Sequence, residues 1–201
     1  MKDWASECLR AVRAVIALAF LLCAIYPLAV WGIGQWLFPG RANGSLLKQG
    51  GETVGSTLIA QPFATPAYFH PRPSAVDYSC SRANSGGSNL GPLSKALNER
   101  VARRSAGYRR QNGLAADFPI PGEALSASAS GLDPHISPAD AAAQAARVAH
   151  ARGMSEARVM KLIRLHLEER QLGIFGEPRV NVLRLNLALD GQGRRADLPR
   201  P

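Results

Sequence analysis

Apolar residues run without interruption through the first part of this chain. No charged residue occurs from Ala14 to Gly40, and Leu, Ala, Ile, Val, Phe and Trp fill most of these 27 positions. A helix needs about 20 apolar residues to cross the hydrocarbon core of a bilayer. The pattern therefore predicts a transmembrane helix over residues 14–38, preceded by a short polar tail over residues 1–13. Pro27 lies mid-span, where proline is tolerated if neighbouring helices or relaxed helical geometry satisfy the carbonyl that it leaves free.

A cleaved signal peptide is the alternative interpretation of this segment. Its apolar core would span about 7–15 residues and would end at a cleavage site made of small residues. The apolar run in this chain is longer and ends in Trp36-Leu37-Phe38-Pro39, so a retained membrane anchor is favoured.

The charges that flank the span predict its orientation. Lys2, Arg10 and Arg13 precede the span, whereas Arg41 and Lys48 follow it. Positive residues stay preferentially in the cytoplasm, and a long domain is translocated largely regardless of its charge. We therefore expect a cytoplasmic tail at the N-terminus and an extracytoplasmic domain after the span.

After the span, the hydrophobic pattern predicts one soluble domain of mixed α/β class. Residues 39–52 are glycine-rich and are interpreted as a linker. Residues 53–190 are assigned to the domain, and residues 191–201 to a flexible tail. The elements expected within the domain are a strand over 53–60, irregular proline-rich structure over 61–79, a helix over 95–105, mostly loop over 106–130, a helix from Ser137 to Gly153, a helix from Ser155 to Gly173, and a strand over 179–189.

The chain has a net charge of +9, and many of its arginines lie between Arg100 and Arg110. Aromatic residues are not interleaved with these arginines beyond Tyr108, which argues against nucleic acid as a partner. We expect residues 103–112 to be solvent-exposed, with a charge that can attract lipid headgroups of the bilayer. The cysteines, Cys8, Cys23 and Cys80, would lie in three different compartments, so no intrachain disulfide is expected.

The stretch SGLDPHISP holds the side chains of a nucleophilic triad, Asp133, His135 and Ser137, within five residues. The members of such triads usually come from distant parts of a chain. Ser137 followed by Pro138, with an acid at Asp140, is instead typical of a helix N-terminus. This pattern favours a turn that starts a helix, and it leaves the side chains of Asp133 and His135 without a structural task.

A glycine-rich loop gives a second candidate site. Gly86, Gly87, Ser88 and Asn89 belong to a GxxxxG stretch that could present N–H groups to an anion. A phosphate-binding loop continues with Lys and then Ser or Thr, but here Pro92 and Leu93 follow, so a structural turn is favoured. The four histidines show no spacing typical of metal ligands, and no metal or resident cofactor is expected.

Six stretches taken together resemble the KdpC family, the C subunit of the potassium-transporting Kdp P-type ATPase. They are GSTLIAQPF (55–63), YFHPRPSA (68–75), SGGSNLGP (85–92), SGLDPHISPADAA (130–142), RVAHARG (147–153) and GEPRVNVLRLNLALD (176–190). The chain departs from the usual family pattern at Leu167 and at Leu93-Ser94-Lys95, so polar roles at those positions are not transferred.

The resemblance implies a non-catalytic subunit of a high-affinity, ATP-driven potassium uptake complex in the bacterial inner membrane. Its implied partners are a channel-like potassium-translocating subunit, a P-type ATPase subunit and a small single-span subunit. The family description credits such subunits with assembly, coupling and, as catalytic chaperones, with raising the ATP affinity of the ATPase subunit. In the resemblance, Asp133 and His135 lie in a recognisable family motif and become candidates for partner contact or for locking the fold.

The expected topology conflicts with direct ATP binding, because ATP is cytoplasmic and the domain is expected outside. Indirect coupling is therefore favoured, and ATP would be bound only jointly with the ATPase subunit. The alternatives are a domain that lies in the cytoplasm and shares a nucleotide site, a membrane-anchored binding module, or an anchored hydrolase that uses Ser137 and His135.

Overall fold

The computed structural model describes residues 2–76 and 84–193, and it divides the chain into two compact units, Met1–Leu46 and Leu47–Pro201. The first unit is helical, and the second combines helices with two small sheets, which confirms the predicted fold class. The position of Cys80, and the last eight residues of the expected flexible tail, lie outside the described residues.

The first unit is a long apolar helix in three parts: α1 (Lys2–Phe20), a π-helical segment (Leu21–Ile25) and α2 (Tyr26–Leu37). In the π segment the Tyr26 N–H donates to the carbonyl of Leu21, five residues earlier. This wider turn directly precedes Pro27, whose ring has no N–H and would press on the carbonyl four residues before it in a regular α-helix. Residues Asp3–Leu37 are long and apolar enough to span a membrane.

A short helix and a tight hairpin follow the apolar helix. Helix α3 covers Pro39–Ala42, and strands β1 (Leu46–Gln49) and β2 (Glu52–Ser56) pair through a Gly50-Gly51 turn. Both glycines have positive φ, as a two-residue hairpin turn requires. The strand predicted over 53–60 ends at Ser56, because the Ser56 hydroxyl accepts the Leu58 N–H and turns the chain away from the sheet.

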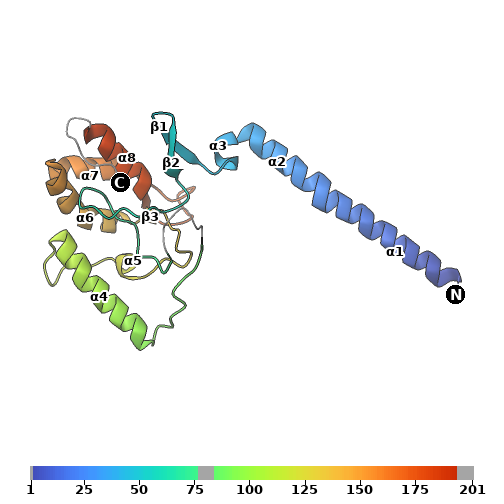
Figure 1. Cartoon of the computed structure of the whole chain (residues 1–201), viewed down its shortest axis with the longest axis horizontal. Helices are drawn as coiled ribbons and strands as arrows, with labels where there is room; N and C mark the ends of the chain where they lie inside the picture. Colours follow the sequence, from blue (N-terminus) through green and yellow to red (C-terminus); the bar gives the residue numbers. More distant parts are fainter. Residues whose placement is uncertain (1, 77–83, 194–201) are drawn as a thin grey trace. The chain divides into compact units, whose positions relative to one another are not determined.

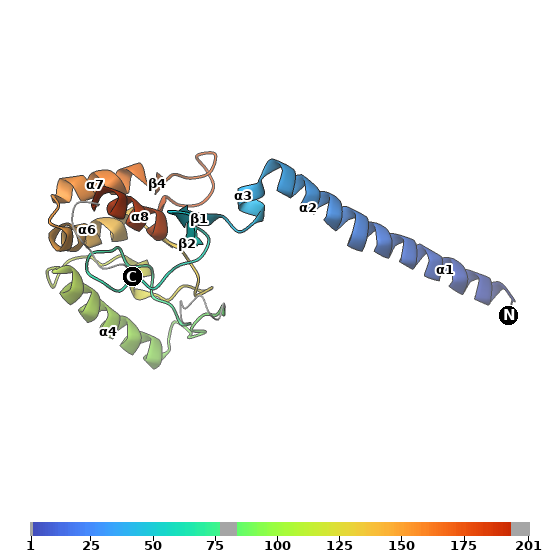
Figure 2. The same ribbon diagram turned by 45° about the horizontal axis from the view of Figure 1, so that its top comes forward.

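The core of the second unit lies between a three-stranded antiparallel sheet and three helices. The sheet has the order β3 (His135–Ile136), β5 (Arg179–Asn181), β4 (Leu167–Glu168). The helices are α6 (Pro138–Arg152), α7 (Glu156–Leu165) and α8 (Val182–Gly193), which lie side by side in Figures 1 and 2. The largest core side chains come from β3, β5, the three helices and the irregular segment before them: Phe69, Ile136, Val148, Val159, Leu162, Ile163, Val180, Leu185 and Leu189.

Helix α6 confirms the predicted start and stop signals. The Ser137 hydroxyl accepts the Asp140 N–H at 3.1 Å, and Gly153 ends the helix with φ +61°. Helix α7 starts after its predicted cap, Ser155, but it ends at Leu165 rather than continuing to Gly173. The continuation was wrong because Leu167 and Glu168 pair with the central strand β5 instead.

The strand predicted over 179–189 is wrong beyond Asn181, where α8 begins. The Asn181 side-chain oxygen accepts the Arg184 N–H at 3.1 Å, which starts the helix. The alternating leucines suggested a strand, but the residues with the lowest exposure follow helical spacing. These are Val182, Leu185, Asn186 and Leu189, at positions i, i+3, i+4 and i+7.

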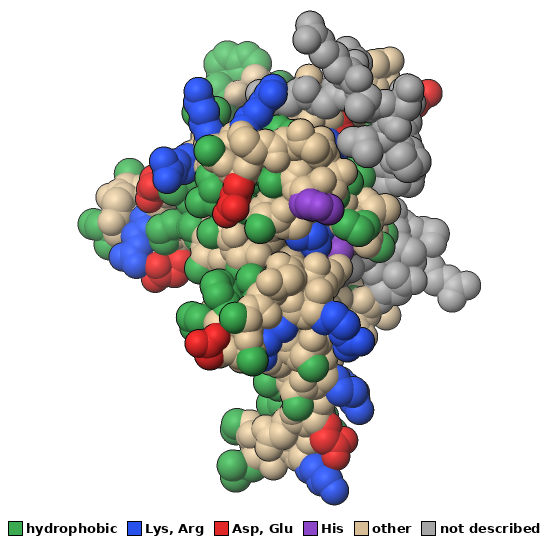
Figure 3. All heavy atoms as spheres, turned by 90° about the vertical axis from the view of Figure 1, so that its left-hand side faces the viewer, with side chains coloured by type: hydrophobic (Ala, Val, Ile, Leu, Met, Phe, Trp, Pro, Cys, Tyr) green, Lys and Arg blue, Asp and Glu red, His purple; other side chains and the backbone are tan. Residues whose placement is uncertain are grey.

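Helix α4 (Lys95–Asn112) is seven residues longer than predicted and ends at Gly113, which has φ +65°. A short helix, α5 (Gly122–Leu125), lies beside it. The prediction that residues 103–112 are wholly solvent-exposed was wrong, because Asn112 is buried and Arg104 and Arg109 donate to the carbonyls of Leu125 and Phe118. Other Lys and Arg side chains lie along one side of the projecting helix (Figure 3).

Candidate functional site

Residues Pro66–His70, within the proline-rich stretch 61–79, are held by side chains instead of by a regular hydrogen-bond ladder. The prolines of this stretch disfavour a helix and provide no N–H donors for a sheet. Its five successive carbonyls, from Pro66 to His70, all accept hydrogen bonds from side chains of α6 and α8. The donors, in the order of the carbonyls, are Arg147 (2.6 Å), Arg152 (2.5 Å), Arg147 (2.9 Å), Asn186 (3.0 Å) and Gln144 (3.2 Å).

Two amide side chains also bind the N–H groups of this segment. Asn186 accepts the Phe69 N–H at 2.9 Å, and Gln144 accepts the His70 N–H at 2.8 Å. Each amide therefore contacts both polar groups of one residue. Because almost all buried backbone groups in proteins are paired, these contacts explain how an irregular segment can carry Phe69 into the core with no exposed surface.

Arg147 is the centre of this network, and only 9% of the residue is exposed. Besides the two carbonyls, it donates to Asn112 Oδ1 at 2.9 Å and to Gln144 Oε1 at 2.7 Å. Burial lowers the pKa of the Arg147 guanidinium to about 10, so the group still carries its charge at neutral pH. We call this set the clamp: Asn112, Gln144, Arg147, Arg152 and Asn186.

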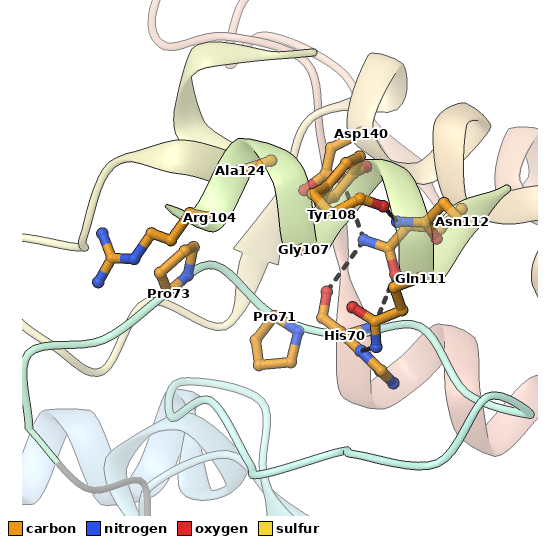
Figure 4. A pocket seen from close by; sticks show the side chains of 11 residues that line it. His70, Pro71, Pro73, Arg104, Gly107, Tyr108, Gln111, Asn112, Ala124 and Asp140 are labelled. Carbon is orange, nitrogen blue, oxygen red and sulfur yellow. Dashed lines mark hydrogen bonds between the residues drawn. The ribbon is translucent and has the colours of Figure 1, made fainter. Parts of the chain in front are cut away.

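A pocket of about 280 Å³ lies between α4, α6 and the clamped segment (Figure 4). Asp140, 1% exposed, accepts hydrogen bonds from the Tyr108 hydroxyl and from Gln144 Nε2. Burial raises the pKa of Asp140 above its ordinary value, and burial together with the Asp140 charge raises that of Tyr108. On the side of the pocket formed by α4 and α6, the polar groups of Tyr108, Asp140 and Gln144 therefore bind one another.

His70 forms the opposite wall of the pocket. Its Nε2 lies 2.9 Å from the carbonyl of Thr65, which can only accept, so Nε2 carries the proton. Its Nδ1 lies 2.9 Å from Gln111 Nε2 and accepts from it. Burial lowers the pKa of His70, which favours the neutral ring.

Asp133 and His135, the two candidates from the sequence, lie in a second polar cluster. Asp133 accepts from Arg72 at 2.8 Å and from the His135 N–H at 3.0 Å. Burial raises the pKa of Asp133, but the hydrogen bonds from His135 and Arg72 outweigh burial and hold it below its ordinary value. The His135 ring lies between two carboxylates, with Nδ1 3.6 Å from Asp133 and Nε2 3.8 Å from Glu168.

The glycine loop packs against the same motif as Asp133. The Gly86 N–H donates to the carbonyl of Ser130 at 2.9 Å, and Asn89 has φ +51°. Gly131 has φ +71°, and a Cβ on it would lie 2.3 Å from the Val76 side chain and 2.9 Å from the Gly86 carbonyl oxygen. Three motifs that are far apart in the sequence, those of Arg72, Gly86 and Asp133, therefore meet here.

This arrangement does not align the Ser137 hydroxyl with His135. The Ser137 hydroxyl faces the N-terminus of α6, where it accepts from Asp140, whereas the His135 ring faces Asp133 and Glu168. Within residues 2–76 and 84–193, no group of three or more His, Cys, Asp or Glu side chains could hold a metal ion. The polar clusters hold the loops and the backbone in place.

Sequence reasoning missed the clamp. Asp140, Gln144 and Arg147 lie at i, i+4 and i+7, so they form a polar stripe on a helix whose other inward residues are mostly alanine. A polar stripe at helical spacing between buried alanines was the pattern that could have revealed it. The acceptors are backbone carbonyls, which the identities of the side chains do not indicate.

Comparisons with known proteins agree with the resemblance seen in the sequence. Residues 8–191 match the family model described as "KdpC: K+-transporting ATPase, c chain". The chain is 53% identical over 186 residues to the potassium-transporting ATPase KdpC subunit of Myxococcus xanthus, covering 92% of this chain and 88% of that one. It is 51% identical over 183 residues to that of Cereibacter sphaeroides (91% and 96%), and 47% identical over 184 residues to that of Mycobacterium bovis (92% and 97%).

Proposed function

Because the chain belongs to the KdpC family, the c chain of the K+-transporting ATPase, we propose that it is a non-catalytic subunit of an ATP-driven potassium uptake complex. The observation that carries the proposal is the match over residues 8–191, which includes the apolar helix and nearly all of the second unit. The polar clusters support a non-catalytic role, since their side chains bind one another and the backbone.

We place the complex in the bacterial inner membrane, with residues 14–38 as its single anchor and the N-terminus in the cytoplasm. The domain, residues 53–190, would lie on the extracytoplasmic side, joined to the anchor by residues 39–52. Three positive residues before the span against two after it favour this orientation slightly. The partners would be the potassium-translocating subunit, the P-type ATPase subunit and the small single-span subunit.

The subunit would act by indirect coupling. The domain would cap the extracytoplasmic side of the potassium-translocating subunit while the span packs against the helices of that subunit. A stabilised arrangement of the complex would then raise the ATP affinity of the ATPase subunit, the role of a catalytic chaperone. Direct nucleotide binding has less support, because at least one N–H group of the glycine loop, that of Gly86, already donates to Ser130.

Asp133 and His135 would hold in place the loops on the surface of the domain that caps the potassium-translocating subunit. Their side chains are 27% and 25% exposed, so part of each can contact a partner while Arg72 and Glu168 hold the rest.

Fusion to reporter enzymes tests the orientation, and co-purification tests membership of the complex. Alkaline phosphatase fused after residue 201 is expected to be active, and GFP at the same place non-fluorescent. Fluorescent GFP with inactive phosphatase would place the domain in the cytoplasm and refute the capping mechanism. The wild-type chain is expected to co-purify with the ATPase subunit in mild detergent, and its isolation without any other subunit would contradict the proposed function.

A further inference from the structure

Three large apolar side chains project from the hairpin that joins β4 to β5. Leu172 is 87% exposed, Ile174 is 74% exposed and Phe175 is 62% exposed. Single exposed apolar residues are ordinary on a protein surface, but three within four positions of one turn form a contiguous patch. We call these three side chains the apolar tip. Figure 2 shows the loop that follows β4 and carries them.

The backbone of the hairpin is well fixed. Gln171 and Phe175 exchange two hydrogen bonds of 2.9 Å, and Gly173 and Ile174 donate to carbonyls within the turn. Three residues adopt positive φ to close it: Leu172, Gly173 and Gly176. Rigid presentation lowers the conformational entropy that is lost on binding, so a fixed apolar tip is suited to recognition.

The charges around the tip favour a protein as its partner over an anionic membrane surface. The Arg170 side chain binds Glu177 at 2.6 Å across the base of the hairpin. Residues 169–177 contain Glu169, Arg170 and Glu177, so the segment carries one positive and two negative charges, a net charge of −1. Elements that dock on anionic lipids carry excess Lys and Arg, whereas apolar and aromatic anchors surrounded by a polar rim without excess positive charge fit a protein interface.

We infer that the apolar tip, Leu172, Ile174 and Phe175, is an anchor that inserts into an apolar pocket of another protein subunit of the transport complex. The inference rests on the proposed function, since that function supplies the partner. The anchor lies in the hairpin between β4 and β5, and β5 also carries the fully buried Val180, so the tip is joined directly to a strand of the domain core.

Paired serine substitutions test the inference in the whole complex, expressed with all subunits. The double variant Leu172→Ser/Ile174→Ser is expected to reduce the amount of the chain retained with the ATPase subunit by about tenfold or more, as loss of interface anchors does. Leu93→Ser is the matched control, because Leu93 is 95% exposed outside the tip, and it should leave retention unchanged. Equal retention of the wild-type chain, the double variant and the Leu93→Ser control would overturn the inference.

A photo-crosslinker at the tip identifies the partner directly. Phe175→p-benzoylphenylalanine in the membrane-embedded complex is expected to form an adduct with one other subunit. Adducts only with lipid, adducts only with a second copy of this chain, or no adduct would each overturn the inference. If the wild-type chain co-purifies with the ATPase subunit in the same experiment, any of these three crosslinking results refutes the anchor but not the proposed function. If the wild-type chain does not co-purify, both the anchor and the proposed function are refuted.

Discussion

Replacement of Arg147 by methionine removes the centre of the clamp while keeping an apolar stem of similar length. The guanidinium donates four hydrogen bonds, to Pro66 O, Tyr68 O, Asn112 Oδ1 and Gln144 Oε1. Each hydrogen bond from a charged group contributes about 1.5–3 kcal/mol, which gives a gross loss of about 6–12 kcal/mol. Part of this is offset, because the variant no longer buries a charge, and water that enters the site can bind some of the orphaned acceptors. A net loss of about 3–5 kcal/mol in the free energy of unfolding is expected, because each buried acceptor that stays unsatisfied costs about 1–3 kcal/mol.

Urea unfolding of the full chain in detergent, followed by far-UV circular dichroism, measures this loss. Trp4, Trp31 and Trp36 all lie in the first unit, so tryptophan fluorescence would not report on the second. Hydrogen exchange of the Phe69 and His70 amides gives a local measurement, since Asn186 and Gln144 protect them. The control is Arg164→Met, an exposed residue in the last turn of α7 that should change stability by less than about 0.5 kcal/mol. A loss below about 1 kcal/mol for Arg147→Met, with unchanged amide protection, would refute the clamp as the element that holds this segment.

Three further changes test other parts of the structure. Because burial lowers the pKa of His70, stability should fall as the pH drops below about 6.5, where the unfolded chain takes up a proton first; the urea midpoint should therefore be lower at pH 5.5 than at pH 7.5. His70→Gln should make this difference smaller, and an equal difference in the variant would assign it to another group. Gly131→Ala should destabilise the domain by about 3 kcal/mol, since its Cβ would meet Val76 and the Gly86 carbonyl, whereas Gly113→Ala has open space and should cost about 1 kcal/mol through its positive φ; equal costs would contradict the packing argument. Ser137→Ala should cost about 1 kcal/mol in thermal or urea unfolding as a lost N-cap, and a stability equal to that of the wild type would show that the hydroxyl does not cap α6.

Much of the domain's local structure could be predicted because the governing interactions are local in sequence. The caps of α6 and α7 depend on a serine and the N–H three residues later, and the end of α6 depends on a glycine that accepts positive φ. Such capping signals act within a few residues, so they do not depend on contacts with distant parts of the chain.

Predictions failed where tertiary contacts outweighed the local pattern. Residues 182–189 alternate leucine with other residues as a strand would, but packing on α7 and β5 selects the helical set of Val182, Leu185, Asn186 and Leu189. The second half of α4 is so polar that it was expected to be loop, yet Tyr108 and Asn112 lie inward and bind Asp140 and Arg147. In both helices the buried face includes polar residues, and the hydrogen-bond partners of these residues are distant in sequence.

The sequence by itself determined the apolar helix, the mixed α/β class and the family, because hydrophobic length and motif order are properties of the linear chain. It left Asp133 and His135 without a structural task, which was wrong for Asp133, because its carboxylate accepts the N–H of His135 two residues later. Only the tertiary structure decided what they and the clamp contact, since Arg72 approaches Asp133 from 61 positions away and Arg147 reaches Pro66 from 81. The physical reason is that the proline-rich segment cannot satisfy its own carbonyls. Their partners are set by which helix lies beside them in the folded domain, and no local pattern records that choice.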